Sequence, residues 1–316
     1  MCTSITLKTL TDSMIAGRTM DFPVNADWRP VLMNSETYPT VLEGTRPIKY
    51  PYIGGGRMVD DRELLVADGV NVAGLSCSEL MFPLKASYNS EPATGKLNLT
   101  PQDFLFWVLA EHDTIASLKK GLDSVHLVGK EWLAGNEVFS FHWIIQDKSG
   151  ATLIVEPINH QLHVIDSRLG VLTNSPTYEQ HVNNLGDYLG IQPTDPNFDE
   201  QVIAKSRQLV TNHQVPEATN TPTTRFLHAA IKKLGTPRSD NAEVAVNFVF
   251  ETLHEVAIPF HPSMNDHPNF NYTHYISAWD NTSLSYYFQD RNASDWSSFS
   301  LSELLKTEPK QNRFLA

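Results

Sequence analysis

Cys2 is the first residue of this sequence to suggest chemistry, because it directly follows the initiator methionine. Removal of Met1 would leave a thiol and a free α-amine on one residue. An α-amine has an ordinary pKa of about 7.7–8.0 and can act as a base near neutral pH, and a thiol needs less activation than a hydroxyl. N-terminal nucleophiles use this combination, although a Met-Cys start also occurs by chance.

A charged pair follows in the segment Gly17-Arg18-Thr19-Met20-Asp21-Phe22. If residues 2–7 and 13–20 form a hairpin, Arg18 and Asp21 reach back toward Cys2. An arginine stabilises a thiolate, and a carboxylate holds an ammonium group or orients an amine. The alternative is an exposed arginine and aspartate in a turn.

Two polar residues later in the chain complete a candidate site. Asn174 ends an apolar segment shortly before Pro176, which is predicted to start a helix. Its amide NH2 group suits an oxyanion hole, and a helix cap is the alternative. Arg225 lies at a predicted helix start, where the helix dipole does not favour a cation. An anionic partner explains this position, and a solvated arginine is the alternative.

Composition excludes several classes of protein. The 316 residues are 41% apolar, with a formal net charge of −12, so the chain is globular and nucleic acid is not an expected partner. The two cysteines, Cys2 and Cys77, cannot form a disulfide framework. No apolar run approaches the ~20 residues of a membrane span, and no signal peptide is recognisable. We therefore expect a soluble, cytoplasmic protein.

The elements that must position these residues follow the order strands, two helices, strands, helices, strands. The first helix is predicted to begin at Pro101 behind Thr100 as N-cap, with Asp103 completing a capping box. Residues 23–51 are predicted to be mostly loop, with a turn at 50–56. The further helices are expected at 113–122, 176–189, 226–234 and 244–256, and the strands at 2–7, 13–20, 63–68, 70–77, 138–146, 151–156, 161–166, 170–173, 272–279 and 284–288.

The strands at 63–68 and 70–77 are predicted to be joined by a hairpin turn at Asp68-Gly69. Helices come in blocks and do not alternate with strands, which argues against a doubly wound parallel sheet. Antiparallel sheets covered by helical layers, an α+β arrangement, fit this order. No repeat or domain boundary is apparent.

Several segments together resemble the choloylglycine hydrolase family. They are Met-Cys-Thr at the start, G-R-T-M-D-F at 17–22, T-N-S-P at 173–176 with Asn183-Asn184-Leu185 downstream, T-R-F at 224–226, and the closing Y-T-x-Y and Y-Y-F. The family contains bile salt hydrolases and penicillin V acylases, which are linear amide C–N hydrolases. The resemblance implies a four-layer αββα sandwich of the N-terminal-nucleophile type, forming a single domain over 1–316 with Met1 removed.

The resemblance also implies roles. The implied catalytic set is Cys2, Arg18, Asp21, Asn174 and Arg225. Cys2 would attack the amide carbonyl, and Asn174 with a backbone N–H near Ser76 or Cys77 would hold the oxyanion. The substrate would be a small-molecule amide, no metal or cofactor is implied, and the chain would form a homo-oligomer, a tetramer as in the family.

Substrate choice depends on Ser76, which we align with an asparagine of typical bile salt hydrolases. Loss of that amide, together with a possible apolar surface from Phe22, Trp28 and Phe82, favours a penicillin V acylase-like amidase over a bile salt hydrolase. Ser76 and Cys77 are then expected at the substrate, although Cys77 can equally be a buried structural thiol.

A protein of another class remains as an alternative. Histidines recur near the C-terminal end of the chain, with acidic residues between them, and such side chains can bind a metal. Their spacing matches no compact ligand motif, so solvated histidines are the competing interpretation. The residues concerned are His254, Glu255, His261, Asp266, His267 and His274.

Overall fold

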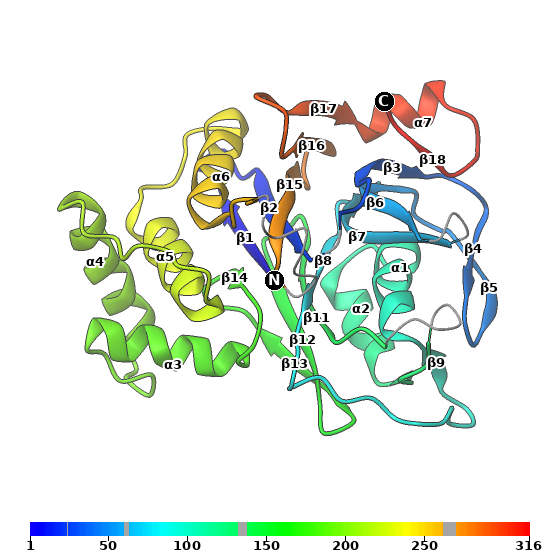
Figure 1. Cartoon of the computed structure of the whole chain (residues 1–316), viewed down its shortest axis with the longest axis horizontal. Coiled ribbons are helices and arrows are strands. Elements are labelled where there is room, and N and C mark those ends of the chain that lie inside the picture. Colours follow the sequence, from blue (N-terminus) through cyan, green and yellow to red (C-terminus); the bar gives the residue numbers. More distant parts are fainter. Residues whose placement is uncertain (24, 60–62, 132–137, 262–269) are drawn as a thin grey trace.

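The computed structural model describes residues 1–316 except 24, 60–62, 132–137 and 262–269. Two antiparallel sheets lie face to face, and helices cover both outer faces (Figure 1). The architecture is therefore the α+β, four-layer αββα arrangement. No helix among these described residues is long and apolar enough to cross a membrane.

The first sheet contains the N-terminal strand, which lies second from one edge and begins with Cys2. Among the described residues it has six strands, all paired antiparallel. Their order is β14 (Val171–Leu172), β1 (Cys2–Lys8), β2 (Met14–Phe22), β15 (Tyr272–Asp280), β16 (Ser285–Asp290) and β17 (Ser297–Ser300).

The second sheet faces the first across the buried interior. Its eight strands, counted over the part of the chain that the structure describes, are also antiparallel. They are, in order, β13 (Gln161–Asp166), β12 (Thr152–Ile158), β11 (Phe141–Gln146), β8 (Ser76–Met81), β7 (Glu63–Asn71), β6 (Tyr52–Val59), β3 (Arg29–Met33) and β18 (Arg313–Phe314). Two further strand pairs lie outside both sheets: β4 (Thr37–Thr40) with β5 (Gly44–Pro47), and β9 (Leu97–Leu99) with β10 (Val125–Leu127).

The helices divide between the two outer faces (Figure 1). Helix α1 packs on the second sheet, and α5 and α6 pack on the first, with α3 and α4 beside them. The bounds are α1 (Pro101–Glu111), α2 (Ile115–Leu122), α3 (Tyr178–Leu189), α4 (Phe198–Thr211), α5 (Pro222–Gly235), α6 (Ala242–Val256) and α7 (Leu301–Thr307).

The predicted start of α1 is confirmed. Pro101 is its first residue, and the carboxylate of Asp103 accepts hydrogen bonds from the backbone N–H of Thr100 at 3.2 Å and from its hydroxyl at 2.7 Å. The predicted start of α3 at Pro176 is wrong by two residues. Thr177 caps that helix by accepting a bond from the N–H of Gln180, so the chain enters the helix only at Tyr178.

The predicted hairpin turn at Asp68-Gly69 is wrong, because β7 runs straight through both residues to Asn71. The chain turns after Asn71, whose Oδ1 accepts bonds from the N–H groups of Ala73 and Leu75. Gly69 is required by close strand contact, since a Cβ there would lie 2.6 Å from the carbonyl oxygen of Ile53.

The turn predicted at 50–56 is also wrong, because residues 52–59 form the strand β6. Its glycines allow neighbouring groups to approach. A Cβ on Gly54 would lie 1.8 Å from the carbonyl oxygen of Asp68, and one on Gly55 would lie 2.4 Å from the Tyr275 hydroxyl. Consecutive glycines here therefore mark a crowded strand and not a loop.

Candidate functional site

Cys2 is the first residue of β1 and is 2% exposed. In the β1–β2 hairpin it pairs with Met20, and Ser4 pairs with Arg18, so Arg18 extends from the strand beside Cys2. Arg18 Nη2 donates a hydrogen bond to Cys2 Sγ at 2.7 Å, and neither residue is open to solvent. A cation at this distance in a buried site stabilises the thiolate, which is the nucleophilic form of cysteine.

The guanidinium of Arg18 is held across the gap between the sheets. Its Nη1 donates to the backbone carbonyls of Ala67 on β7 at 2.8 Å and Glu79 on β8 at 2.9 Å. Burial acts to lower the pKa of Arg18, but the neighbouring Cys2 and other anionic groups outweigh it and raise that pKa. Arg18 therefore stays cationic at the sulfur.

Asp68 lies beside the guanidinium of Arg18 and helps to hold it in place. The sequence analysis did not identify Asp68 as a functional residue. Its carboxylate accepts bonds from the hydroxyls of Tyr275 at 2.5 Å and Tyr286 at 2.7 Å, and its Oδ2 lies 3.9 Å from Arg18 Nε. Burial raises the pKa of Asp68. The available signal was a carboxylate inside an apolar strand, which the Asp-Gly turn motif concealed.

Asp21 offers an unused acceptor near the chain terminus. Its Oδ1 accepts a bond from the Thr273 hydroxyl at 2.7 Å, which fixes the carboxylate. Its Oδ2 is buried without a hydrogen-bond partner among the described residues, and the nearest cation is Arg225 Nη1 at 3.8 Å. Such an oxygen can hold an ammonium group.

The N-terminal amine lies in the same buried region. The amine of Met1 donates to the backbone carbonyl of Asp21 at 2.9 Å and to Asn271 Oδ1 at 3.1 Å. Burial lowers the pKa of this amine below its ordinary value of 8.0. The environment around the start of β1 therefore favours a neutral amine, which is the form that acts as a base.

Asn174 lies directly behind Cys2, two residues after the end of β14. Its Oδ1 accepts bonds from the Cys2 backbone N–H at 2.7 Å and from Arg225 Nη2 at 2.9 Å, and its Nδ2 donates to the Met81 carbonyl at 2.7 Å. These contacts fix the amide orientation. Its side chain does not cap α3, because Thr177 does so.

Arg225, in the first turn of α5, is fully buried, so it is not a solvated arginine. Its Nη1 donates to the Cys2 carbonyl and to the Thr3 hydroxyl, both at 2.7 Å. Burial lowers the pKa of Arg225 below its ordinary value. The structure thus brings all five predicted catalytic residues together around Cys2.

A small pocket opens at Cys2 between the two sheets, and two of the predicted substrate-contact residues line it. Phe22 and Trp28 form part of its wall, with ring centroids 6.2 Å apart. The pocket also includes Glu79, whose pKa burial raises well above the usual range. Cys2, Arg18 and Asp21 form its polar side, and the rest of the wall is apolar: Met20, Leu65, Ala67, Met81, Phe139 and Phe141.

Phe82 does not line this pocket, contrary to the prediction. Its ring stacks on His142 with centroids 4.3 Å apart, and it has no exposed surface. It follows Met81 directly, but successive side chains at a strand end point to opposite sides. Phe82 is therefore part of the core.

Ser76 and Cys77 do not lie at the Cys2 pocket either. They begin β8, where they pair with Gln146 and Ile145, whereas Arg18 meets the same strand at Glu79. Three residues of strand correspond to about 10 Å. The Ser76 hydroxyl donates to the Gln146 carbonyl and accepts from Asn281 Nδ2 at 2.8 Å, so it anchors the strand start.

Cys77 belongs to the buried cluster between the second sheet and α1. Burial raises the pKa of its thiol well above the ordinary value, which keeps it protonated and unreactive. The alternative interpretation of Cys77 as a structural thiol fits this position.

The histidines of the metal-binding alternative do not converge in the described part of the chain, where no group of three or more His, Cys, Asp or Glu residues could hold a metal ion. His254 bonds Gln289 Oε1 at 2.9 Å, and His274 bonds the Phe22 carbonyl at 3.1 Å. Asp266 and His267 lie outside the described residues.

The chain is similar to known proteins over most of its length. Residues 2–308 match the family described as linear amide C–N hydrolases, choloylglycine hydrolase family. The chain is 30% identical over 264 residues to a bile salt hydrolase/transferase of Clostridium perfringens, covering 82% of this chain and 79% of that protein.

Two solved structures share the fold. One is the C2A mutant of the conjugated bile acid hydrolase from Clostridium perfringens, with a TM-score of 0.82, 24% identity and coverage of 100% of this chain and 97% of the other. The other is penicillin V acylase from Agrobacterium tumefaciens, with a TM-score of 0.74, 19% identity and coverage of 96% and 87%. The predicted fold class is confirmed.

Proposed function

Because this chain belongs to the choloylglycine hydrolase family of linear amide C–N hydrolases, we propose that it cleaves its amide through Cys2 as an N-terminal nucleophile. The observation that carries this proposal is the buried contact of 2.7 Å between Arg18 Nη2 and Cys2 Sγ. Removal of Met1 frees the amine of Cys2, and the unpartnered Asp21 Oδ2 supplies an acceptor for it when it is protonated.

The reaction runs in two halves. Cys2 Sγ attacks the carbonyl carbon, and the Cys2 amine takes up the thiol proton where the thiol is not already ionised. That proton passes to the leaving nitrogen as the C–N bond breaks, which leaves a thioester on Cys2. Water then attacks the thioester, the amine base accepts its proton, and the free acid leaves with regeneration of the thiol. No metal or cofactor takes part.

Asn174 is our candidate for stabilising the negative oxygen of the tetrahedral intermediate. Its Nδ2 has two hydrogens, and the Met81 carbonyl accepts one of them. The bonds from Cys2 and Arg225 to Oδ1 hold the amide so that this donor needs no reorientation during the reaction. A preorganised donor of this kind contributes strongly to catalysis.

Replacing Asn174 with alanine should lower kcat by roughly 10²–10³ with little change in KM, because the lost donor acts on the transition state. Steady-state kinetics with any cleaved amide measures this. Ser76→Ala is the matched control, since Ser76 lies outside the pocket, and it should leave kcat/KM unchanged. A large rise in KM with unchanged kcat for Asn174→Ala would make Asn174 a binding residue.

The pocket at Cys2 supports a substrate with an apolar, preferably aromatic, acyl group. Phe22, Trp28, Phe139 and Phe141 surround it, and aromatic rings bind other rings by stacking and edge contacts. We propose penicillin V, whose acyl group is phenoxyacetyl, as the preferred type of substrate. This preference rests on the aromatic wall alone, since Ser76 lies outside the site.

Conjugated bile salts are the second candidate, favoured by the 30% identity to the Clostridium perfringens bile salt hydrolase/transferase. Hydrolysis of penicillin V, glycocholate, taurocholate and an acyl-homoserine lactone should be measured side by side. We expect kcat/KM to be highest for penicillin V. A value for glycocholate that exceeds it by tenfold or more would assign the protein to bile salts instead.

The remaining features of the protein are proposals that follow from the resemblance. We propose a single catalytic domain over residues 1–316 without Met1, a tetrameric assembly and a cytoplasmic location. Sedimentation of the purified protein tests the tetramer, because a monomer at working concentration would contradict it.

A further inference from the structure

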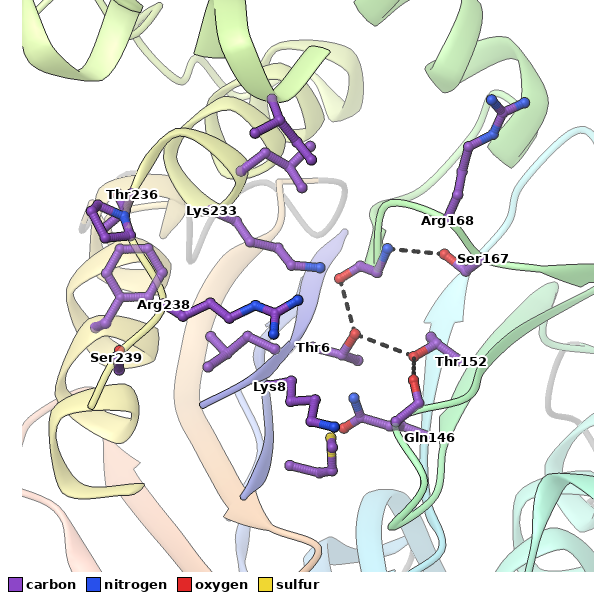
Figure 2. A pocket seen from close by; sticks show the side chains of 18 of the residues that line it. Thr6, Lys8, Gln146, Thr152, Ser167, Arg168, Lys233, Thr236, Arg238 and Ser239 are labelled. Atoms are coloured by element: carbon purple, nitrogen blue, oxygen red, sulfur yellow. Dashed lines mark hydrogen bonds between the residues drawn. The ribbon is translucent and has the colours of Figure 1, made fainter. Parts of the chain in front are cut away.

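A second and larger pocket lies at the far end of β1 from Cys2 (Figure 2). Its volume is about 600 Å³, within the range of small-molecule sites. Its walls come from β1, the middle of α4, the end of α5 with the segment 236–239 after it, and the segments around 149–152 and 167–170. Lys8 lies six residues beyond Cys2 along β1, about 20 Å away, so this pocket is distinct from the amidase site.

The lining of this pocket, which we call the basic pocket, is positively charged. Among the residues that the structure describes, five that line the pocket are basic and none is acidic, although the chain has 36 Asp and Glu against 24 Lys and Arg. The five are Lys8, Arg168, Arg207, Lys233 and Arg238. A concentration of cations in a hollow of an acidic protein attracts anions.

Nearby carboxylates compensate only part of this charge. Lys8 pairs with Asp12 at 2.6 Å and Arg168 with Asp199 at 3.2 Å, and both pairs are solvent-exposed. Exposed pairs of this type contribute little and exchange readily. Asp12 also acts on Arg238 over a longer range, but the described residues place no carboxylate in the lining itself.

Three cations have no ion pair in the described part of the chain: Arg207, Lys233 and Arg238. Figure 2 shows the side chains of Lys233 and Arg238 both extending into the basic pocket. Lys233 Nζ donates to the Leu169 carbonyl, which uses one of its three hydrogens. Burial lowers the pKa of Lys233 to about 7, so a bound anion would favour its charged form.

The hydroxyls that line the basic pocket already have partners within the protein. Those of Thr6 and Thr152 lie 3.5 Å apart, Ser167 donates to the Tyr178 hydroxyl, and Ser149 donates to the Asp147 carboxylate. Recognition of phosphate-like oxygens therefore rests on the cations, and the arginines allow bidentate contacts. The cations come from separate parts of the chain, among them β1, α4 and α5. A single ligand that contacts several of them therefore needs more than one negatively charged group.

We propose that the basic pocket binds a small organic anion with two or more negative charges, of the diphosphate class. This inference is independent of the amidase mechanism. The basic pocket shares elements with the catalytic site, because β1 carries both Cys2 and Lys8, and α5 carries both Arg225 and Lys233. Binding can nevertheless be measured without any turnover.

Inorganic pyrophosphate is the probe, titrated into the full-length protein by calorimetry at constant ionic strength, with orthophosphate in parallel. We expect saturable binding of pyrophosphate at one site per chain, and weaker binding of orthophosphate. Arg238→Gln and Lys233→Gln should each weaken pyrophosphate binding by about tenfold, the effect of one charge-assisted hydrogen bond.

Lys120→Gln is the matched control, because Lys120 also lies in the last turn of a helix but outside the basic pocket. It should change the affinity less than twofold. Arg238 is exposed, so its variant should fold even if Lys233→Gln does not. Equal affinities in all variants, or no saturable binding, would overturn the proposal. If a variant dissociated the assembly and the wild-type protein bound no pyrophosphate, this surface would be a subunit contact. That result would also overturn the proposal.

Discussion

Replacing Cys2 with alanine should reduce turnover to the background rate while the fold is retained. The substitution removes the atom that forms the thioester, and no other group in the pocket at Cys2 is a reactive thiol or hydroxyl. Loss of one sulfur atom leaves the anchoring bonds of Arg18 to the Ala67 and Glu79 carbonyls in place. Initial rates, circular dichroism and a thermal melt measure the two parts of this prediction.

The second cysteine provides the control for that experiment. Cys77 is buried in the other apolar cluster, so Cys77→Ala should keep kcat and lower only the melting temperature. Activity that survives in Cys2→Ala would exclude the thioester mechanism.

Neutralising Arg18 should have the second largest effect. In Arg18→Gln the sulfur loses its cationic partner, and the buried Asp68 loses the cation that lies 3.9 Å from its carboxylate. Breaking a buried charge cluster costs roughly 3–5 kcal/mol of folding stability, so we expect a lower melting temperature. Because the thiolate also loses the cation that stabilises it, we expect a fall in kcat/KM of about 10³ or more.

Arg18→Lys distinguishes the effect of the positive charge at this position from the effect of the hydrogen-bond geometry of arginine. Lysine keeps the charge but cannot make the forked contacts to Ala67 and Glu79, so activity should be recovered only in part. If Arg18→Gln melted at a lower temperature but kept the wild-type kcat/KM when measured well below that temperature, Arg18 would be a structural residue and not part of the nucleophile's environment.

Much of the fold could be predicted because local patterns and tertiary structure agree. The hairpin of β1 and β2 and the start of α1 at Pro101 follow from alternation and capping residues. The turns at 50–56 and at Asp68-Gly69 were predicted wrongly because the glycines there allow close contact between strands that are distant in sequence. Asp68-Gly69 and the glycines of β6 look like turns locally, but they allow close packing beneath Tyr275, more than 200 residues away in sequence.

Some residues of the candidate site could likewise be predicted from the sequence, and others could not. Cys2, Arg18, Asp21, Asn174 and Arg225 could be proposed because each has an unusual side chain for its position, and the structure brings them together. Ser76 was expected at the substrate only because it was aligned with an asparagine of typical bile salt hydrolases, whereas the structure places it at the start of β8, bonded to Gln146 and Asn281. Asp68 depends on partners from β15 and β16, which no local pattern reveals.

The central claim is that Cys2, freed of Met1, carries the acyl group. Its most direct test is mass spectrometry of the active protein, quenched in acid during turnover of its best amide substrate. We expect an intact mass without Met1 and a population carrying one acyl group, located on the N-terminal peptide at Cys2. Fully active protein that retains Met1, or an acyl group on any other residue, would contradict it.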